Sequence, residues 1–314
     1  MKRRIAPVVL VGLVAACAAP DNGPTAVANP ASQVSSVNAV NEQAGPPEVK
    51  IFHARGFNGA PPRQAGGKRS PNMTNHGGVI MTKAIIQPIY WGPSWSNSTF
   101  VDDKITGLAS FYSGWNNSHF ANTNVEYSGS NGRVGAISTF TAGVTDLSNA
   151  SGGGSSSAIL AAVCRNIPNP DQSGNGYYPV YTDIPRGNAG YCAWHSAGTC
   201  FGVRVQFAFF WKLDGDSGCD PVDGSGLHTQ GLAALANVTA HELSEAVTDP
   251  ANPGAWYDGQ GYENADKCAW VFNATSLTTL SNGAKFKVQG NWSNAAYNAG
   301  TGYANSSGQK GCIN

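Results

Sequence analysis

The sequence has few charged side chains and no excess of either sign. Lys and Arg number 19, Asp and Glu number 19, and charged residues make up 12% of the 314 residues. A protein that binds nucleic acid or an anionic membrane through its surface charge needs a basic excess, so neither function is indicated. No internal repeat is visible, which argues against a solenoid or a propeller.

A long apolar run that could span a membrane permanently is also missing. The N-terminus, "MKRRIAPVVLVGLVAACAAP", has a basic start, a short apolar stretch and then small residues. This layout predicts a secretory signal peptide over residues 1–17. The end of the stretch resembles a bacterial lipobox with Cys17 as the lipidated residue, and ordinary cleavage near Ala16 is the alternative. We therefore expect a secreted or cell-envelope protein whose only membrane contact would be a lipid anchor at Cys17.

The cysteines lack the two-residue spacing of a zinc knuckle, which argues against thiolate zinc ligation. Without Cys17, the chain keeps Cys164, Cys192, Cys200, Cys219, Cys268 and Cys312. An even set of six in an exported chain predicts three disulfides. The pairing is open, and the short separation of Cys192 and Cys200 makes them the first expected pair.

Residues 18–75 have few large apolar side chains and are rich in Ala, Pro, Ser, Asn and Gly. Such a segment buries too little surface to offset the entropy of ordering, so we expect a flexible tether or a cleaved pro-segment. "KIFHARGF" at residues 50–57 is the one patch in it that we expect to dock. The folded domain is predicted over residues 76–314.

Strand-like and helix-like patterns alternate within that domain. Strands are predicted at 78–92, 124–128, 133–143, 178–185 and 203–211, and helices at 97–115, 156–166 and 231–249. The strand at 203–211 is apolar on both faces and is therefore expected at the centre of the sheet. The fold class predicted is a single disulfide-bonded α/β or α+β domain, with a mixed sheet flanked by helices and a metalloprotease-like active helix.

The helix at 231–249 carries the main functional motif, "HELSE". His241 and Glu245 are one turn apart on one face, and Glu242 adjoins the first of them. This is the layout of a zinc-protease helix, in which two residues bind the metal and the adjacent Glu acts as general base. The sequence departs from the usual "HExxH" motif because Glu245 stands in place of the second His. A carboxylate also binds zinc, so the metal is not excluded.

The acidic side chains around this helix are unusually concentrated. Six of the 19 acids lie between residues 242 and 266, and no Lys or Arg occurs in that stretch. Their mutual repulsion would destabilise the fold unless a cation or solvent relieved it. "YENADKC" resembles the segment of thermolysin-like enzymes that supplies a third ligand. The resemblance implies Glu263 as that ligand and Asp266 as its neighbour or substitute. The alternative is a solvated acidic loop.

A second acidic stretch, "LDGDSGCDPVDGSG", has part of a calcium-binding pattern. Asp214, Asp216 and Asp220 match the 1, 3 and 7 spacing of a calcium loop, but Ser225 occupies the place of the bidentate Glu. Gly and Asp also form turns for backbone reasons alone. A calcium site here is thus an expectation with an incomplete motif. A histidine in the position of His195 is more often structural, and lining a cleft is the alternative.

Several segments together resemble the EXORDIUM, or phosphate-induced protein, family of secreted proteins. They are "HGGVIMTKAIIQPIYWGPSW" at 76–95, the helix after it, "YCAWHS" and the helix near 231–250. The resemblance spans roughly residues 76–312. It implies an extracellular or cell-wall protein with no settled biochemical activity, in a microbial branch that carries the His and Glu residues.

The motif and the resemblance lead to different functional expectations. The motif predicts a zinc-dependent hydrolase, a candidate peptidase, with His241, Glu245, Glu263 and Asp266 as metal ligands and Glu242 as the catalytic base. Its partner would be a peptide or cell-wall substrate. The resemblance predicts a non-enzymatic extracellular or cell-surface binding protein. A carbohydrate-active or wall-binding module is a further alternative.

Overall fold

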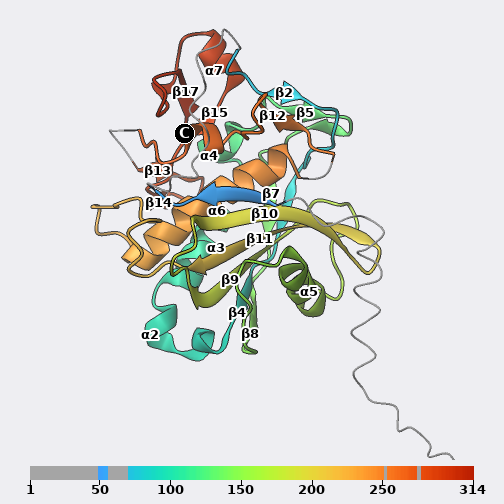
Figure 1. Ribbon diagram of the computed structural model, residues 1–314, viewed down its shortest axis with the longest axis vertical. Coiled ribbons are helices and arrows are strands. Elements are labelled where there is room, and N and C mark those ends of the chain that lie inside the picture. The colour runs from blue at the N-terminus through green and yellow to red at the C-terminus, as the bar shows by residue number, and fades with distance from the viewer. Residues whose placement is uncertain (1–48, 56–69, 251–252, 274–276) are drawn as a thin grey trace, which may run out of the picture.

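The computed structural model describes residues 49–55, 70–250, 253–273 and 277–314, and Figure 1 shows their arrangement. The predicted signal peptide and the lipobox Cys17 lie outside the described residues, as does most of the predicted tether. Two short stretches of that tether nevertheless belong to the fold. Lys50–His53 forms strand β1 and Thr74–Asn75 forms strand β2, and each pairs with a strand of the main domain.

The core of the molecule is an eight-stranded mixed sheet. Its path runs β1, β10 (Tyr191–Cys200), β11 (Val203–Lys212), β9 (Gly176–Pro185), β3 (Ala84–Ile86) and β7 (Ser138–Phe140). Strand β4 (Ile89–Trp91) also pairs with β9, and β8 (Val144–Asp146) pairs with β4. Strand β11 pairs antiparallel with β10 and parallel with β9. Its interior residues are buried, which confirms the predicted central position.

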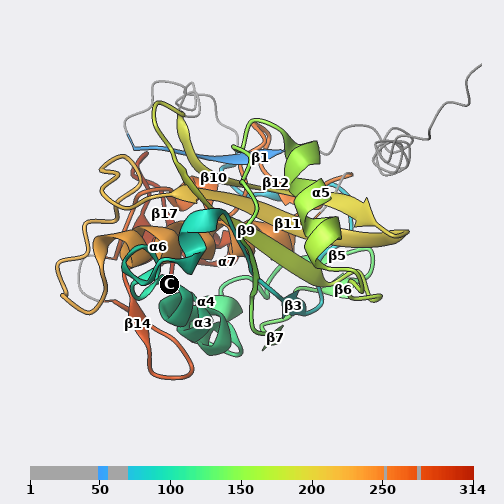
Figure 2. The same cartoon turned by 90° about the horizontal axis from the view of Figure 1, so that it is seen from below.

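Helices cover both faces of this sheet, as Figures 1 and 2 show. Helices α6 (Gln230–Thr248) and α3 (Lys104–Trp115) pack against each other on one face, and α5 (Ser156–Asn166) lies on the other. Thr229 caps the start of α6, because its side chain accepts a hydrogen bond from the Leu232 amide. The helix ends before Pro250, because proline cannot continue the helical hydrogen bonds. The predicted class, a mixed sheet flanked by helices, is confirmed.

Short elements complete the fold around these layers. They are η2 (Pro93–Ser96), α2 (Ser98–Val101), α4 (His119–Asn122), β5 (Ser128–Gly129), β6 (Gly132–Arg133), β12 (Trp256–Tyr257), η3 (Asp266–Cys268), β13 (Thr278–Thr279), β14 (Lys285–Phe286), β15 (Asn291–Trp292), α7 (Asn294–Asn298), β16 (Tyr303–Ala304) and β17 (Lys310–Ile313). None of the helices in the described part of the chain has the length and hydrophobicity needed to cross a membrane.

The predicted elements are largely present, with breaks at particular residues. The helix expected at 97–115 is divided at Asp102, whose φ of 46° is incompatible with a right-handed helix. The strand at 78–92 is divided before Pro88, since proline cannot donate to a ladder. The prediction of a strand at 124–128 is wrong except for its last residue. Strand β10 was not predicted, because its Ala, Ser and Gly residues weaken the strand pattern.

Three disulfides join the described cysteines. They are Cys164–Cys200, Cys192–Cys219 and Cys268–Cys312. The expected Cys192–Cys200 pair is wrong because both residues belong to strand β10. An extended strand separates residues eight apart by roughly 26 Å, far beyond the span of a disulfide. The three bonds are consistent with an oxidising compartment.

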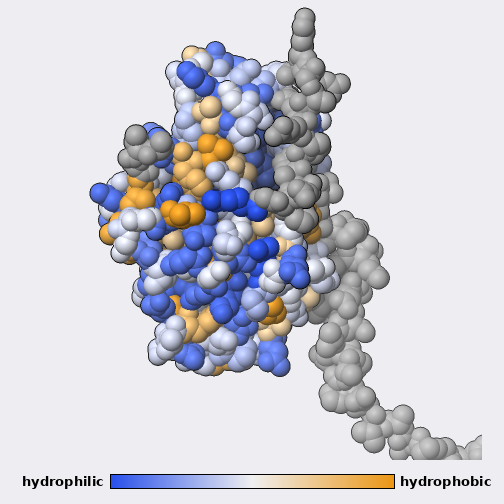
Figure 3. Space-filling view, turned by 60° about the vertical axis from the view of Figure 1, so that its left-hand side comes forward, coloured by the Kyte–Doolittle hydropathy of each residue, from blue (hydrophilic) through white to orange (hydrophobic). Residues whose placement is uncertain are grey.

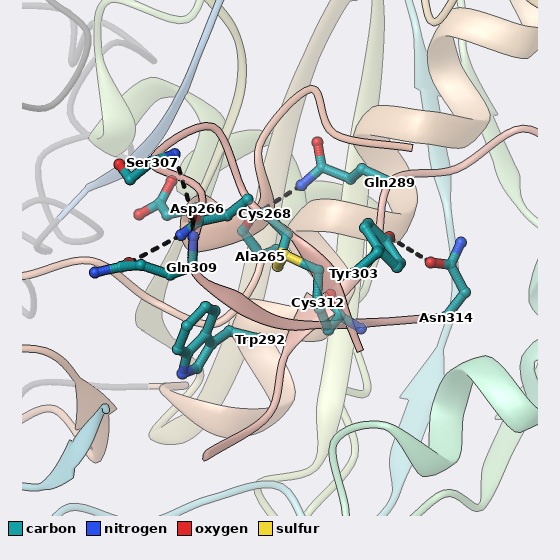
Figure 4. The surroundings of a disulfide bond; sticks show 12 residues. Ala265, Asp266, Cys268, Gln289, Trp292, Tyr303, Ser307, Gln309, Cys312 and Asn314 are labelled. Atoms are coloured by element: carbon teal, nitrogen blue, oxygen red, sulfur yellow. Dashed lines mark hydrogen bonds between the residues drawn. A yellow bond between two sulfur atoms is a disulfide. The ribbon is translucent and has the colours of Figure 1, made fainter. Parts of the chain in front are cut away.

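The surface seen in Figure 3 is mostly hydrophilic, with apolar side chains in separate small patches. Most of the large apolar side chains of the described residues are buried, including those of α6. The disulfide Cys268–Cys312 ties β17 to the turn η3, which follows the acidic segment, and its surroundings are shown in Figure 4.

Replacing both Cys268 and Cys312 with Ala should destabilise the protein and loosen that turn. The bond closes a loop of 44 residues, and loop-closure entropy then gives a loss of about 4 kcal/mol in unfolding free energy. Denaturant unfolding measures the loss, and hydrogen exchange measures protection at residues 263–268. The Cys164→Ala/Cys200→Ala variant is the matched control, with a separation of 36 residues. It should lose similar stability without loosening this turn, and equal exchange in both variants would contradict the assignment.

Candidate metal centre

Helix α6 is unusual because it is surrounded by protein. Every residue of it except Gln230 is buried, including His241, Glu242 and Glu245. These three side chains lie on one face because positions three and four apart are neighbours on a helix. Burying ionisable groups is costly unless each is paired, protonated or bound to a cation. The charges of these buried side chains must therefore be compensated.

The described residues form two clusters whose ligand atoms lie within 4.8 Å of one another. The first cluster comprises His241, Glu245 and Asp266, and the second comprises His195, Glu242 and Glu245. Glu245 belongs to both, and neither contains both imidazoles. Buried His, Glu and Asp side chains in these groups could hold a metal ion.

Atoms of the first cluster are spaced as ligands of one cation would be. His241 Nε2 lies 3.0 Å from Glu245 Oε1 and 3.6 Å from Asp266 Oδ1. Ligand atoms on a tetrahedral zinc ion, each about 2.1 Å from the metal, are about 3.4 Å apart. In the absence of a cation, a protonated His241 forms an ion pair with Glu245 through Nε2. The three side chains nevertheless point toward a common position.

The turn that carries Asp266 is fixed to the helix. The backbone amide of Asp266 donates to Glu245 Oε1 at 2.9 Å, and Asp266 Oδ2 accepts from the Glu263 amide at 3.3 Å. Gln289 Nε2 donates to the Ala265 carbonyl, and it lies 3.0 Å from His241 Nδ1. These contacts hold the His241 ring in place, with Nε2 facing the two carboxylates.

The second cluster adds a residue from the sheet. His195 extends from β10, and its Nε2 lies 3.6 Å from Glu245 Oε2 and 3.3 Å from Glu263 Oε2. Both carboxylate oxygens of Glu242 and the Oε1 of Glu263 are buried and make no hydrogen bond within the described residues. Buried carboxylates without a hydrogen-bond partner are rare in folded proteins, and a bound cation would compensate their charge.

Burial and mutual repulsion shift the proton affinities of these groups. Burial raises the pKa of Glu242 and of Glu263 well above the ordinary range for Glu, and nearby carboxylates add to it. Burial, with repulsion from Asp266, raises the pKa of Glu245 to about 7. Burial opposes the charged form of His241, but the carboxylates of Glu245, Asp266 and Glu242 raise its pKa to about 10. In the metal-free protein, protons therefore compensate the charge.

His195 differs from His241 in its electrostatics. Burial lowers the pKa of His195 well below its ordinary value, and the positive charges of Lys50 and His241 lower it further. Its imidazole is therefore neutral at physiological pH, which is the state that binds metals.

The structure brings three of the four expected metal ligands into one cluster and leaves the fourth outside it. His241 and Glu245 are joined in one cluster by Asp266, whereas Glu263 contacts His195 and lies in neither cluster. His195, for which a structural role and a place in a cleft were both left open, lies beside Glu245 and Glu263. The sequence did not predict that His195 lies near the motif, because only the pairing of strands in the sheet places this residue beside α6.

Other acids near the motif have basic partners. Asp258 forms an ion pair with Lys267 at 2.6 Å, and Asp249 lies 3.7 Å from Lys50. The acids of the proposed calcium loop are also engaged elsewhere. Asp214 pairs with Lys104 and Asp216 pairs with Arg186, both at 2.7 Å, while Asp220 accepts the Val222 amide. None of the three belongs to a metal-like cluster in the described chain, so the structure gives the calcium expectation no support.

No protein-family model, curated protein or solved structure matches this chain. The assignment of the site therefore rests on its own geometry.

Cation binding at this site should strengthen as pH rises. Carboxylates and an imidazole with raised pKa hold protons at neutral pH, and an incoming cation must displace them. Calorimetric titration of the metal-free protein with Zn²⁺ should show an apparent affinity that rises by about thirtyfold between pH 6 and pH 7.5, which corresponds to about one proton released. Repeating it in buffers of different ionisation enthalpy counts the protons. A pH-independent affinity would contradict the site described.

Proposed function

We propose that this protein is an exported zinc-dependent hydrolase that cleaves peptide bonds. The observation that carries the proposal is the convergence of His241 Nε2, Glu245 Oε1 and Asp266 Oδ1 on one position, beside the unpartnered carboxylate of Glu242. Asp266 replaces Glu263 as the third proposed ligand because it shares a cluster with the other two.

The donor set favours zinc over calcium. Calcium takes oxygen ligands, whereas an imidazole nitrogen with two carboxylates suits zinc, and three protein ligands leave a position for water or substrate. A zinc ion here would polarise a carbonyl group and lower the pKa of a water molecule. His241, Glu245 and Asp266 would hold the ion, and Gln289 would keep the imidazole in place.

Glu242 is the proposed general base. Its carboxylate lies in the second cluster, within 4.8 Å of a Glu245 oxygen, and it makes no competing hydrogen bond among the described residues. Burial raises its pKa well above the usual value, and a zinc ion beside it would lower that pKa again and favour the carboxylate that accepts a proton. His195 shares this cluster with Glu242 and would position the substrate or the carboxylate itself.

A second candidate function is that of an EXORDIUM-like extracellular binding protein in which the metal is structural. Burial of the site favours this candidate, since Asp266, at 19% side-chain exposure, is the most accessible member of the first cluster. A structural metal needs no access for substrate. The disulfides and the predicted signal peptide are compatible with either function.

The variants His241→Ala and Glu242→Gln should fail in different ways. His241→Ala removes the only nitrogen ligand of the first cluster, so zinc affinity and activity should both fall. Glu242→Gln keeps the size of the side chain but cannot accept a proton. Zinc content should therefore stay at the wild-type level, while cleavage of an unfolded protein substrate should fall by about a hundredfold or more.

His228→Ala and Glu126→Gln are matched controls from outside the clusters. His228 stacks on Phe286, and Glu126 accepts amide hydrogen bonds from the start of α7. Both variants should keep zinc and activity. Loss of zinc in Glu242→Gln would make Glu242 a ligand, and a wild-type protein that binds zinc but cleaves nothing would favour the binding-protein candidate.

A further inference from the structure

Strand β1 lies directly over the metal centre. It is the edge strand of the sheet and pairs antiparallel with β10, with Lys50 opposite His195 and Phe52 opposite Ala193. Figure 1 shows it as the blue strand in front of α6.

Phe52 is the main contact between this strand and the site. Its ring stacks on the His241 imidazole, with centroids 3.8 Å apart and planes inclined by 14°, and on Trp270 at 4.8 Å. Phe52 is 1% exposed, whereas Ile51 on the other face of the strand is 39% exposed. The aromatic ring therefore fills a pocket whose floor is a proposed zinc ligand.

Charged and backbone contacts hold the strand on both sides of Phe52. Lys50 Nζ lies 3.7 Å from the buried carboxylate of Asp249 and 5.1 Å from the centre of the Tyr257 ring. Trp270 Nε1 donates to the His53 carbonyl at 3.0 Å. This combination of contacts is typical of a bound extended peptide. In such a complex, backbone hydrogen bonds supply affinity and pockets for alternate side chains supply specificity.

We propose that β1 occupies a binding groove for an extended peptide, formed by the edge of β10, Trp270 and Asp249. The ligand class is a peptide strand that carries an aromatic side chain against His241 and a basic side chain two residues before it. Strand β1 fills the groove in this chain and closes the metal centre. The consequence for catalysis rests on the proposed hydrolase function, but peptide binding by the groove does not.

The groove explains how a buried site can act on a polymer. With β1 in place, Phe52 covers one face of the His241 ring and Lys50 neutralises Asp249. When β1 leaves, the edge of β10, the place of the Phe52 ring and the carboxylate of Asp249 become available to a second strand of the same chemistry. That strand would lie next to the metal ligands. An extended peptide in place of β1 would lie across α6 in the same orientation.

The test compares full-length Phe52→Ala with Ile51→Ala, which alters the outward face of the same strand. Emptying the pocket weakens the docking of β1, so zinc should leave Phe52→Ala for a chelator about tenfold or more faster than it leaves the wild type. Ile51→Ala should match the wild type. The added peptide VKIFHAR should bind to the Phe52→Ala variant, as followed by tryptophan fluorescence. Its binding should restore the slow loss of zinc. The peptide VKIAHAR should do neither.

Each other outcome is informative. If Phe52→Ala does not fold, Lys50→Gln replaces it, since it weakens the contact with Asp249 and keeps the core intact. Wild-type rates of zinc loss and no peptide binding in the folded variant would show that β1 is a fixed part of the sheet, and the proposal would be wrong. Peptide binding by a variant that cleaves no substrate would overturn the hydrolase function and leave the groove standing.

Discussion

The enclosure of ionisable side chains around helix α6 is the constraint on which the rest of the structure depends. His241, Glu242 and Glu245 are buried on one helix face, and His195 and Glu263 are buried against them. Isolated charges in such a place would cost several kcal/mol each. Protons compensate them in the metal-free protein, and a divalent cation would do so with better geometry, because the imidazole and carboxylates then bind one ion instead of repelling each other.

Features far apart in the sequence serve this arrangement. The disulfide Cys268–Cys312 anchors the turn that presents Asp266, and the Asp266 amide bonds to Glu245. Strand β10 contributes His195 from the sheet side, and Gln289 orients His241 from the opposite side. Strand β1 closes the remaining side through Phe52. The site is therefore a property of the whole tertiary fold, although its centre is one helical motif.

The sequence predicted the parts of this site that depend on local pattern. The helix limits near residues 230 and 248 followed from apolar periodicity and Pro250, and the spacing of His241 and Glu245 fixed their common face. Partners brought together by the sheet were not predictable. His195 lies in a strand with a weak pattern, and the choice between Glu263 and Asp266 depends on the conformation of a short turn, which local pattern does not specify. The same limit applies to Cys192, whose partner is set by strand geometry.

The central claim is that one cation lies among His241, Glu245 and Asp266. Anomalous diffraction at the zinc absorption edge, from crystals of the full chain grown with Zn²⁺, tests it most directly. The account predicts a peak within about 2.3 Å of His241 Nε2, Glu245 Oε1 and an Asp266 oxygen, since zinc binds nitrogen and oxygen at about 2.0–2.2 Å. The absence of a peak there, with the side chains unchanged and the carboxylates protonated, would contradict it.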